Sequence, residues 1–347
     1  MFNKNIRIHN KIISQSSATF VIAEAGVNHG GDMSIAKKLI DLAILAKADA
    51  VKFQTFKADH LILKNIPKAP YQKKTTDSSE TQYEMLKRLE VTKDQNIELY
   101  EYCLKNGIIF LTTPFDEESL SDLDYIDLPA YKIASTDITN IPFLIKIARK
   151  GKPIILSSGM SYLHEVKIAL DAIYKYNKDV ILLQCTANYP IKNSEANLAV
   201  LDTYKSNFDI LLGYSDHSVG TGAAPFAIPM GAKVLEKHFT LDKSLEGPDH
   251  KASLSPEELV DFLKIVRKVD EYMGSSIKEP TASELGTRKS LQKCLVAKLK
   301  IKKGDSFTKK NLVAKRTGGI GISPIDIDKI LYKSAKKNYK QNQIIEK

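Results

Sequence analysis

The amino-acid sequence predicts an α/β protein, namely a (β/α)8 TIM barrel followed by a small β-rich domain. Two observations predict the barrel. Eight short runs rich in Val, Ile and Leu recur along the chain, and amphipathic stretches lie between them. Runs with so little polar alternation are typical of parallel strands buried on both faces. The alternating part also takes about 250 residues, which is the usual size of such a barrel.

The chain begins with residues 1–18, which we expect to form a short hairpin or cap. The predicted strands then follow in order: Thr19–Ala25, Ala50–Gln54, Ile108–Thr112, Ala130–Ile133, Pro153–Ser157, Val180–Gln184, Ile210–Tyr214 and Lys233–Glu236. The clearest helical patterns are Ser34–Ala48, Ile141–Lys150, Tyr162–Tyr176 and Ser255–Met273. The last of these opens with Ser-Pro-Glu-Glu, which offers an N-cap, a proline at the first helical position and acids in the first turn.

Two segments depart from this alternation. Residues 57–93 are too long for a simple loop, so we expect a lid-like insertion over the barrel mouth with a short helix near its end. At Ser283–Lys293 the periodic pattern gives way to a polar linker, and short β-like runs with glycine turns follow. The predicted domains are therefore 1–282, the barrel, and 283–347, the linker and small domain. A doubly wound sheet is the alternative fold, but AEAGVNHGG matches its glycine fingerprint poorly.

Composition indicates a soluble globular protein of the reduced cytoplasm. Of the 347 residues, 43% are hydrophobic and 27% charged, which is ordinary for such a protein. No apolar run approaches the roughly 18 residues of a membrane span, and the N-terminus lacks the features of a signal peptide. The three cysteines, at 103, 185 and 294, have neither disulfide-framework nor zinc-knuckle spacing.

The net charge of +10 is unevenly distributed. Residues 288–347 hold 17 of the 51 Lys and Arg residues but only 4 of the 41 Asp and Glu residues, a net charge of +13, whereas the rest of the chain carries −3. The barrel-sized part is thus nearly neutral, and we expect no nucleic-acid ligand. A basic tail can meet phosphates or an acidic partner, although a solvated lysine-rich face explains most of these charges.

Candidate site residues gather at the carboxyl ends of the predicted strands, which is where a TIM barrel holds its active site. They are Glu24, Lys52, Gln54, Lys132, Ser135, Asp137, Ser157, Asn188, Tyr189, His217 and His238. His217 and His238 follow neighbouring strands, so they could share one divalent ion. Lys52 and Lys132 lie in apolar contexts where an unpaired charge is costly, so they suit an anion that carries phosphate and carboxylate.

Eight motifs along nearly the whole chain resemble those of the sialic acid synthase family. They are IAEAGVNHGG, VKFQTFKAD, FLTTPFD, YKIAS, ILSSGM, QCTANYP, GYSDHS and LEKHFTLDKSLEGPDHKASL. A further stretch, IKKGDSFTKKNLVAKRTGGIGISP, resembles the antifreeze-protein-like (SAF) domain of these enzymes. The resemblance implies condensation of phosphoenolpyruvate with an N-acetylated mannose-type sugar to a nine-carbon nonulosonic acid.

The resemblance also implies roles for particular residues. His217 and His238 match metal ligands, most often for Mn²⁺, with Mg²⁺ or Co²⁺ as alternatives, and Glu24 and Asp137 match the acids beside the metal-bound water. Phosphoenolpyruvate would be held by Lys52, Lys132, Ser135, Ser157 and Ser215. The sugar would contact Gln54, Asn188, Tyr189, Asp249 and Arg316. The resemblance implies that Arg316 reaches the site from the partner subunit of a domain-swapped homodimer.

Asp137 is the main departure from the family, because many bacterial members have glutamate there. This departure supports the first of two alternatives that stay open beside a synthase of N-acetylneuraminate or N,N'-diacetyllegionaminate. One is a catalytically silent sugar-binding protein that keeps the barrel. The other is a related enzyme of phosphoenolpyruvate–sugar condensation, of the pseudaminate or spore-coat polysaccharide type.

Overall fold

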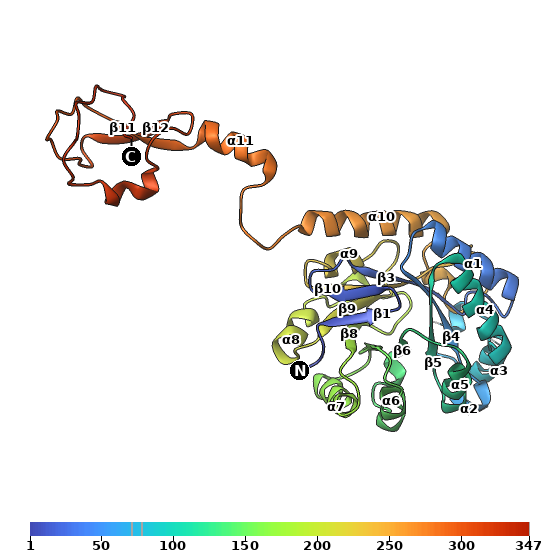
Figure 1. The fold of residues 1–347 in the computed structure, drawn as a ribbon. Coiled ribbons are helices and arrows are strands. Elements are labelled where there is room, and N and C mark those ends of the chain that lie inside the picture. Colours follow the sequence, from blue (N-terminus) through green and yellow to red (C-terminus); the bar gives the residue numbers. More distant parts are fainter. Residues whose placement is uncertain (71, 78, 347) are drawn as a thin grey trace. The chain divides into compact units, whose positions relative to one another are not determined.

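The larger unit of the chain, Met1–Gly274, contains a closed parallel barrel. In the residues that the structure describes, 1–70, 72–77 and 79–346, this computed structural model has one eight-stranded sheet in which strands adjacent in sequence are adjacent in space. Strand β10 pairs with β3, and β5 lies against β6, so the sheet closes (Figure 1). The strands are β3 (Phe20–Gly26), β4 (Ala50–Thr55), β5 (Ile109–Pro114), β6 (Tyr131–Ile133), β7 (Ile154–Ser157), β8 (Val180–Cys185), β9 (Leu211–Asp216) and β10 (Ala232–His238). The predicted TIM barrel is confirmed.

The helices surround the sheet and bury their apolar faces against it (Figure 1). They are α1 (Met33–Leu45), α4 (Lys93–Asn106), α5 (Glu117–Asp122), α6 (Ile141–Ala148), α7 (Leu163–Tyr174), α8 (Val200–Asn207), α9 (Ala224–Ala227) and α10 (Pro256–Met273), with short 3₁₀ turns η2 (Leu123–Tyr125), η3 (Ser135–Asp137), η4 (Asn193–Glu195) and η5 (His250–Ala252). Ser255 caps α10 as predicted, by accepting from the N–H of Glu258 while the Glu258 carboxylate accepts from the N–H of Ser255.

The N-terminal hairpin closes the end of the barrel opposite the strands' carboxyl ends. It consists of β1 (Asn5–Ile8) and β2 (Lys11–Ser14), paired antiparallel. Ile6, Ile8 and Ile13 are fully buried in one apolar cluster with residues from the beginnings of the barrel strands, such as Phe20 and Ile109. This floor leaves only the carboxyl ends of the strands open for a site.

The insertion at residues 57–93 has more regular structure than its sequence predicts. It contains α2 (Ala58–Leu61), the 3₁₀ turn η1 (Gln72–Lys74) and α3 (Gln82–Lys87), and only α3 was expected. Tyr71 and Ser78 lie outside the described residues. Met85 of α3 and Leu89 are buried against Val27 and Phe56, so the insertion has an apolar core of its own.

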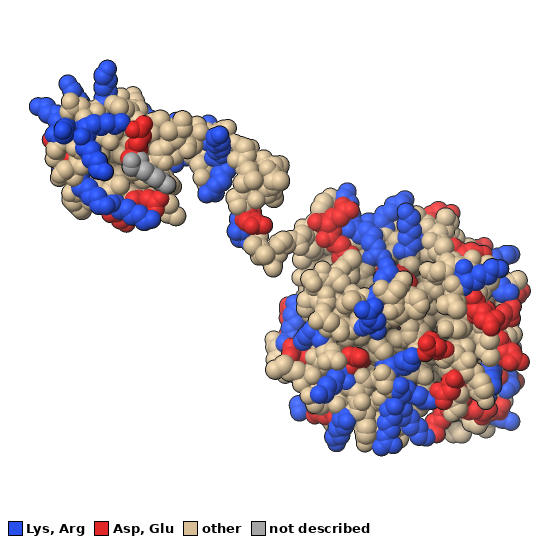
Figure 2. Space-filling model, viewed as in Figure 1, with Lys and Arg blue, Asp and Glu red and all other residues tan. Residues whose placement is uncertain are grey.

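The second compact unit, Ser275–Lys347, contains α11 (Ala282–Leu291), β11 (Lys293–Ala297), β12 (Leu312–Arg316) and the 3₁₀ helix η6 (Pro324–Lys329). The two strands pair antiparallel over a separate apolar core. The predicted polar linker at Ser283–Lys293 is mostly helical, because α11 covers most of it, and none of the residues of α11 is buried. Thr281 and Glu284 form a capping box, a sequence signal that the prediction overlooked. On the face shown in Figure 2, Lys and Arg side chains of this unit far outnumber its acidic ones.

Candidate active site

A cavity of about 700 Å³ lies at the carboxyl ends of the barrel strands, and it brings together nearly all of the predicted site residues. Those that line it are Glu24, Lys52, Gln54, Lys132, Ser135, Asp137, Ser157, Tyr189, Ser215, His217, His238 and Asp249. Asn188 is absent from the lining residues that the structure describes; its side chain is exposed, and its Oδ1 accepts from the N–H of Tyr189. Arg316 ends β12 of the second unit, where it is exposed.

Two buried lysines form the cationic part of the cavity. The Nζ of Lys52 lies 2.8 Å from Oε2 of Glu24 and donates to the hydroxyl of Thr113 at 3.0 Å. The Nζ of Lys132 donates to the hydroxyl of Ser157 at 2.7 Å. Both lysine side chains are almost fully buried. Charges held out of water in this way need partners of opposite charge, either in the protein or in a ligand.

Glu236, which was not predicted as a site residue, lies between these lysines. One carboxylate oxygen is 3.6 Å from the Nζ of Lys52 and the other is 3.7 Å from that of Lys132. The second oxygen also accepts from the hydroxyl of Ser215 at 2.9 Å. Burial raises the pKa of Glu236, but the attraction of Lys132 and Lys52 outweighs it and lowers the pKa to about 2.

Glu24 differs from Glu236 because the effect of burial on its pKa outweighs the attraction of the neighbouring lysine. Desolvation raises the pKa of Glu24 to about 7, although the charge of Lys52 opposes this. Its Oε1 accepts from the side-chain amide of Gln54 at 3.2 Å. The site thus holds two lysines against one firmly ionised carboxylate, and a second carboxyl that titrates near neutrality. The surplus positive charge suits an anionic ligand.

The two histidines lie side by side at the end of β9 and β10, with ring centroids 5.4 Å apart. Nδ1 of His217 is 2.8 Å from the carbonyl oxygen of Thr186. A carbonyl only accepts, so Nδ1 carries the proton and Nε2 is left as an acceptor or metal ligand. Burial and the neighbouring His217 hold the pKa of His238 well below its usual value, so its imidazole is neutral, the form that binds metals.

These histidines fit a divalent metal ion that has most of its coordination shell open. Nδ1 of His238 is buried and lacks a hydrogen-bond partner within the described part of the chain. Among those same residues no group of three His, Cys, Asp or Glu side chains has metal-binding geometry. An ion held by the two histidines would have its remaining positions open to substrate and water. The ring of Tyr189 lies against His217, with centroids 4.0 Å apart.

Two more acids line the cavity. Asp137, in η3, accepts from the side-chain amide of Asn140 and the hydroxyl of Thr136, both at 3.3 Å, and burial raises its pKa. Oδ2 of Asp249 lies 3.7 Å from Nδ1 of His238, and burial raises the pKa of Asp249 to about 6. Carboxyls with raised pKa values in a cleft are candidates for proton transfer.

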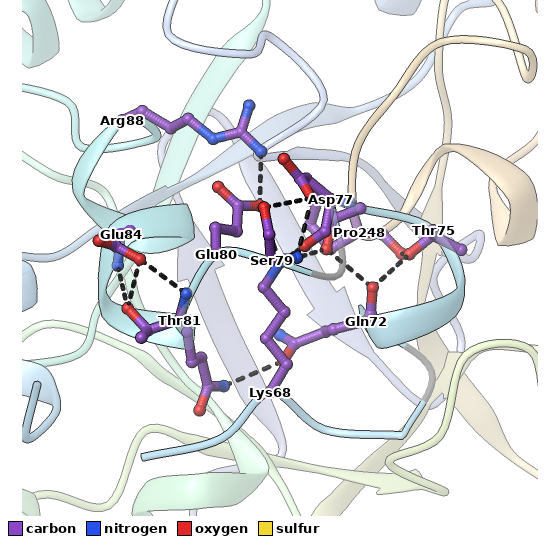
Figure 3. Close-up of polar contacts among 12 residues, drawn as sticks. Lys68, Gln72, Thr75, Asp77, Ser79, Glu80, Thr81, Glu84, Arg88 and Pro248 are labelled. Carbon is purple, nitrogen blue, oxygen red and sulfur yellow. Dashed lines mark hydrogen bonds and ion pairs between the residues drawn. The ribbon is translucent and has the colours of Figure 1, made fainter. Parts of the chain in front are cut away.

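The insertion forms the outer wall of the same cavity and is held by a buried lysine, Lys68 (Figure 3). The Lys68 Nζ donates to the hydroxyl of Thr76 at 2.9 Å and pairs with Glu80 at 2.8 Å, and Arg88 pairs with the same Glu80 oxygen at 2.8 Å. The wall that these contacts support is mostly apolar. The insertion lines the cavity with the apolar side chains of Leu61, Ile62, Ala69, Met85, Leu86 and Leu89 and with the polar ones of His60, Gln72 and Gln82, and the barrel adds Val27, Phe56 and Phe115.

The fold and cavity define a class of protein: a TIM barrel whose cavity holds two buried lysines beside a pair of histidines. The sequence model of a protein family, described as "NeuB family", matches residues 39–278 of this chain. The chain is 45% identical over 330 residues to N,N'-diacetyllegionaminic acid synthase of Campylobacter jejuni, which covers 94% of this chain and 98% of that protein. It is 42% identical over 321 residues to the enzyme of the same name from Legionella pneumophila, covering 91% of this chain and 90% of that one.

A solved structure agrees with these relatives. The crystal structure of N-acetylneuraminic acid (sialic acid) synthetase from Leptospira borgpetersenii superposes with a TM-score of 0.73 at 35% identity, over 84% of this chain and 98% of that one. The chain belongs to the NeuB family. The resemblance to sialic acid synthases and the prediction of an enzyme are thereby confirmed. Among the described residues, none of the helices has the length and apolar character needed to span a membrane.

Proposed function

We propose that the protein condenses phosphoenolpyruvate with an N-acetylated mannose-type sugar to give a nonulosonic acid and phosphate. The observation that carries this proposal is the placement of two buried lysines against one ionised carboxylate, in the same cavity as two buried histidines. The lysines would bind an anion, and the histidines would hold the ion that activates its reaction partner.

Phosphoenolpyruvate is the anion that this arrangement suits. Its phosphate and carboxylate would be bound by Lys52, Lys132 and the hydroxyls of Ser135, Ser157 and Ser215, all of which line the cavity. Ser157 and Ser215 already contact the charged cluster, through Lys132 and Glu236. Donors held in place before the anion arrives add little reorganisation cost when charge develops on it.

His217 and His238 would hold a divalent ion, which we propose to be Mn²⁺, with Mg²⁺ and Co²⁺ as alternatives. When bound, this ion would polarise the aldehyde of the open-chain sugar. C3 of phosphoenolpyruvate then forms a carbon–carbon bond to the aldehyde carbon. Water adds at C2, and the C2–O bond to phosphate breaks with release of inorganic phosphate.

Glu24 and Asp137 would move the protons of this sequence. Water that adds at C2 must lose a proton, and the new hydroxyl at the former aldehyde must gain one. Glu24, with its pKa of about 7, can hold or release a proton at neutral pH. Asp137 lines the same cavity and has a raised pKa, so it can share this work.

The sugar would contact Gln54, Tyr189 and Asp249, with Asn188 beside them and Arg316 supplied by the partner subunit of a homodimer. We favour a 2,4-diacetamido-2,4,6-trideoxy sugar over N-acetylmannosamine. Two of the relatives most similar to this chain are synthases of N,N'-diacetyllegionaminic acid. The apolar wall from the insertion also suits a sugar that has a methyl group and a second acetamido group in place of hydroxyls.

The test is phosphate release from phosphoenolpyruvate with each of the two sugars, with and without Mn²⁺, followed by mass spectrometry of the product. We expect turnover that requires the metal, with a higher kcat/KM for the diacetamido sugar. Turnover of neither sugar by the folded, metal-loaded protein would contradict the proposal. Sugar binding without phosphate release, unchanged in His217→Ala, would support a silent binding protein instead.

A further inference from the structure

A buried ion pair lies directly behind the two histidines. Strands β9 and β10 pair so that Ser215 is opposite Glu236 and Asp216 is opposite Lys237. Side chains alternate across a sheet, so Asp216 and Lys237 point away from the cavity while the residues on either side of them point into it. Neither Asp216 nor Lys237 is among the residues that line the cavity.

The contacts of this pair are close and numerous. The Nζ of Lys237 lies 2.9 Å from Oδ2 of Asp216 and donates to the carbonyl of Ser218 at 2.5 Å. The Asp216 carboxylate also accepts from the N–H and the hydroxyl of Ser218, at 2.9 and 2.6 Å, and from the N–H of Ala224 at 3.1 Å. The two side chains are 1% and 0% exposed. Lys237, which precedes His238, therefore contacts both neighbours of His217 in the chain, Asp216 and Ser218.

The loop after His217 is packed against this pair so closely that it requires glycine. A Cβ on Gly222 would lie 2.0 Å from the Ser218 hydroxyl oxygen, 2.7 Å from Oδ2 of Asp216 and 2.9 Å from the Nζ of Lys237. Gly222 also has a φ of +60°, which disfavours other residues. The loop can thus close on the ion pair only because this position has no side chain.

We propose that the Asp216–Lys237 pair is the positioning device of the metal site and sets the spacing of His217 and His238. Each member of the pair is covalently next to one histidine, so their contact fixes the two backbones at the point where the imidazoles emerge. Stability alone does not account for such a pair, since buried ion pairs are often no more stabilising than apolar residues of similar volume. A role in fixing geometry does account for it.

This inference rests on the proposed function, because it assumes that the histidines bind a metal. The test measures binding of Mn²⁺ to the full-length protein, by the loss of the electron paramagnetic resonance signal of free Mn²⁺. The variants are Lys237→Met and Asp216→Asn, which remove the attraction with little change in volume. Circular dichroism and thermal unfolding check that each variant is folded. The control is Arg267→Met, which breaks a different and partly buried ion pair, to Asp49 at 2.7 Å, away from the cavity.

We expect the dissociation constant for Mn²⁺ to rise about 10- to 100-fold in both variants, as is usual when groups that orient metal ligands are removed. The control should bind Mn²⁺ as the wild type does. Folded Lys237→Met and Asp216→Asn proteins with wild-type affinity would overturn the inference, and so would an equal loss in Arg267→Met. If Lys237→Met does not fold, the Mn²⁺ affinity of Asp216→Asn decides the question. Wild-type protein that binds no Mn²⁺ would instead remove the metal from the proposed function, and the positioning role with it.

Discussion

Glu24 and Lys52 are opposite one another on the neighbouring strands β3 and β4, and they form a buried ion pair at 2.8 Å. Even so, burial outweighs the attraction of Lys52 and raises the pKa of Glu24 to about 7. A carboxyl that would ordinarily be ionised at neutral pH is therefore part protonated there. Its neighbour Glu236, which faces two lysines, is ionised throughout that range. One cavity thus holds a proton carrier and a fixed negative charge.

The first prediction concerns the pH dependence of catalysis. If Glu24 acts as the base, kcat should rise as the pH increases through about 7, because the base form appears above the pKa. Glu24→Gln should lower kcat by about 100-fold or more and remove this limb of the profile. The measurement is phosphate release at saturating substrates across pH. A Glu24→Gln protein with near wild-type kcat and an unchanged profile would assign the base elsewhere.

The second prediction concerns stability. Glu236→Gln removes the negative charge from between Lys52 and Lys132, and breaking a buried pair in this way costs about 3–5 kcal/mol. We expect a loss of that order in the free energy of unfolding at pH 7, measured with urea. The folded-state pKa of Glu236, about 2, is below its ordinary value of 4.5. Its stabilisation is therefore complete above pH 4.5 and is lost as the pH falls toward 2.

The matched control for this experiment is Glu80→Gln, since Glu80 also faces two cations but is less buried. It should cost less stability than Glu236→Gln, because partly exposed pairs are worth less. The acid-induced loss of stability between pH 4.5 and 2 should be smaller in Glu236→Gln than in the wild type. If Glu236→Gln loses as much stability between pH 4.5 and 2 as the wild type does, Glu236 is not the group that titrates there.

The barrel was predictable because its strands are continuous apolar runs, and polar residues at their ends mark the site. Glu236 was not predicted as a site residue, although it ends the predicted strand Lys233–Glu236, because an acid at one strand end does not by itself indicate which charges it will meet. Its spacing from His238 was the usable signal, since residues two apart share a face of a strand. What no local pattern contains is the closure of the sheet, which brings Glu236 of β10 between Lys52 of β4 and Lys132 of β6.

The third prediction concerns the short acid at position 137. Asp137 lies in η3 and is held by Asn140 and Thr136 at 3.3 Å, distances that are long for hydrogen bonds to a carboxylate. Such weak bonds cost little to re-form when the carboxylate shifts, so Asp137→Glu should retain kcat within about tenfold. Asp137→Asn removes the acid and should lower kcat by about 100-fold or more. Equal activity of the two variants would exclude proton transfer by this residue.

The fourth prediction concerns the insertion. Lys68 contacts Thr76 and Glu80 within the insertion, which lines the cavity, whereas Lys52 and Lys132 lie on barrel strands β4 and β6. Lys68→Met should loosen the wall and raise KM for the sugar several-fold, with little change in KM for phosphoenolpyruvate. Steady-state kinetics with each substrate varied in turn measures both. A parallel rise in both KM values would instead indicate that the whole cavity is disturbed.

The last prediction concerns Arg316, which lies in the second unit at the end of β12 and which we propose acts in the partner's barrel. Arg316→Ala should raise KM for the sugar and leave binding of Mn²⁺ unchanged, since the histidines belong to the first unit. His217→Ala should be inactive because it loses a proposed metal ligand, although its Arg316 is intact. Mixed dimers of the two variants would contain one site with both groups intact if the arginine acts across subunits. Up to about half of the sites in such a heterodimer would then be active, and phosphate release after mixing should exceed that of either variant alone. Differently tagged chains show whether subunits have exchanged. If they have exchanged and activity does not increase, Arg316 acts within its own chain or not at all.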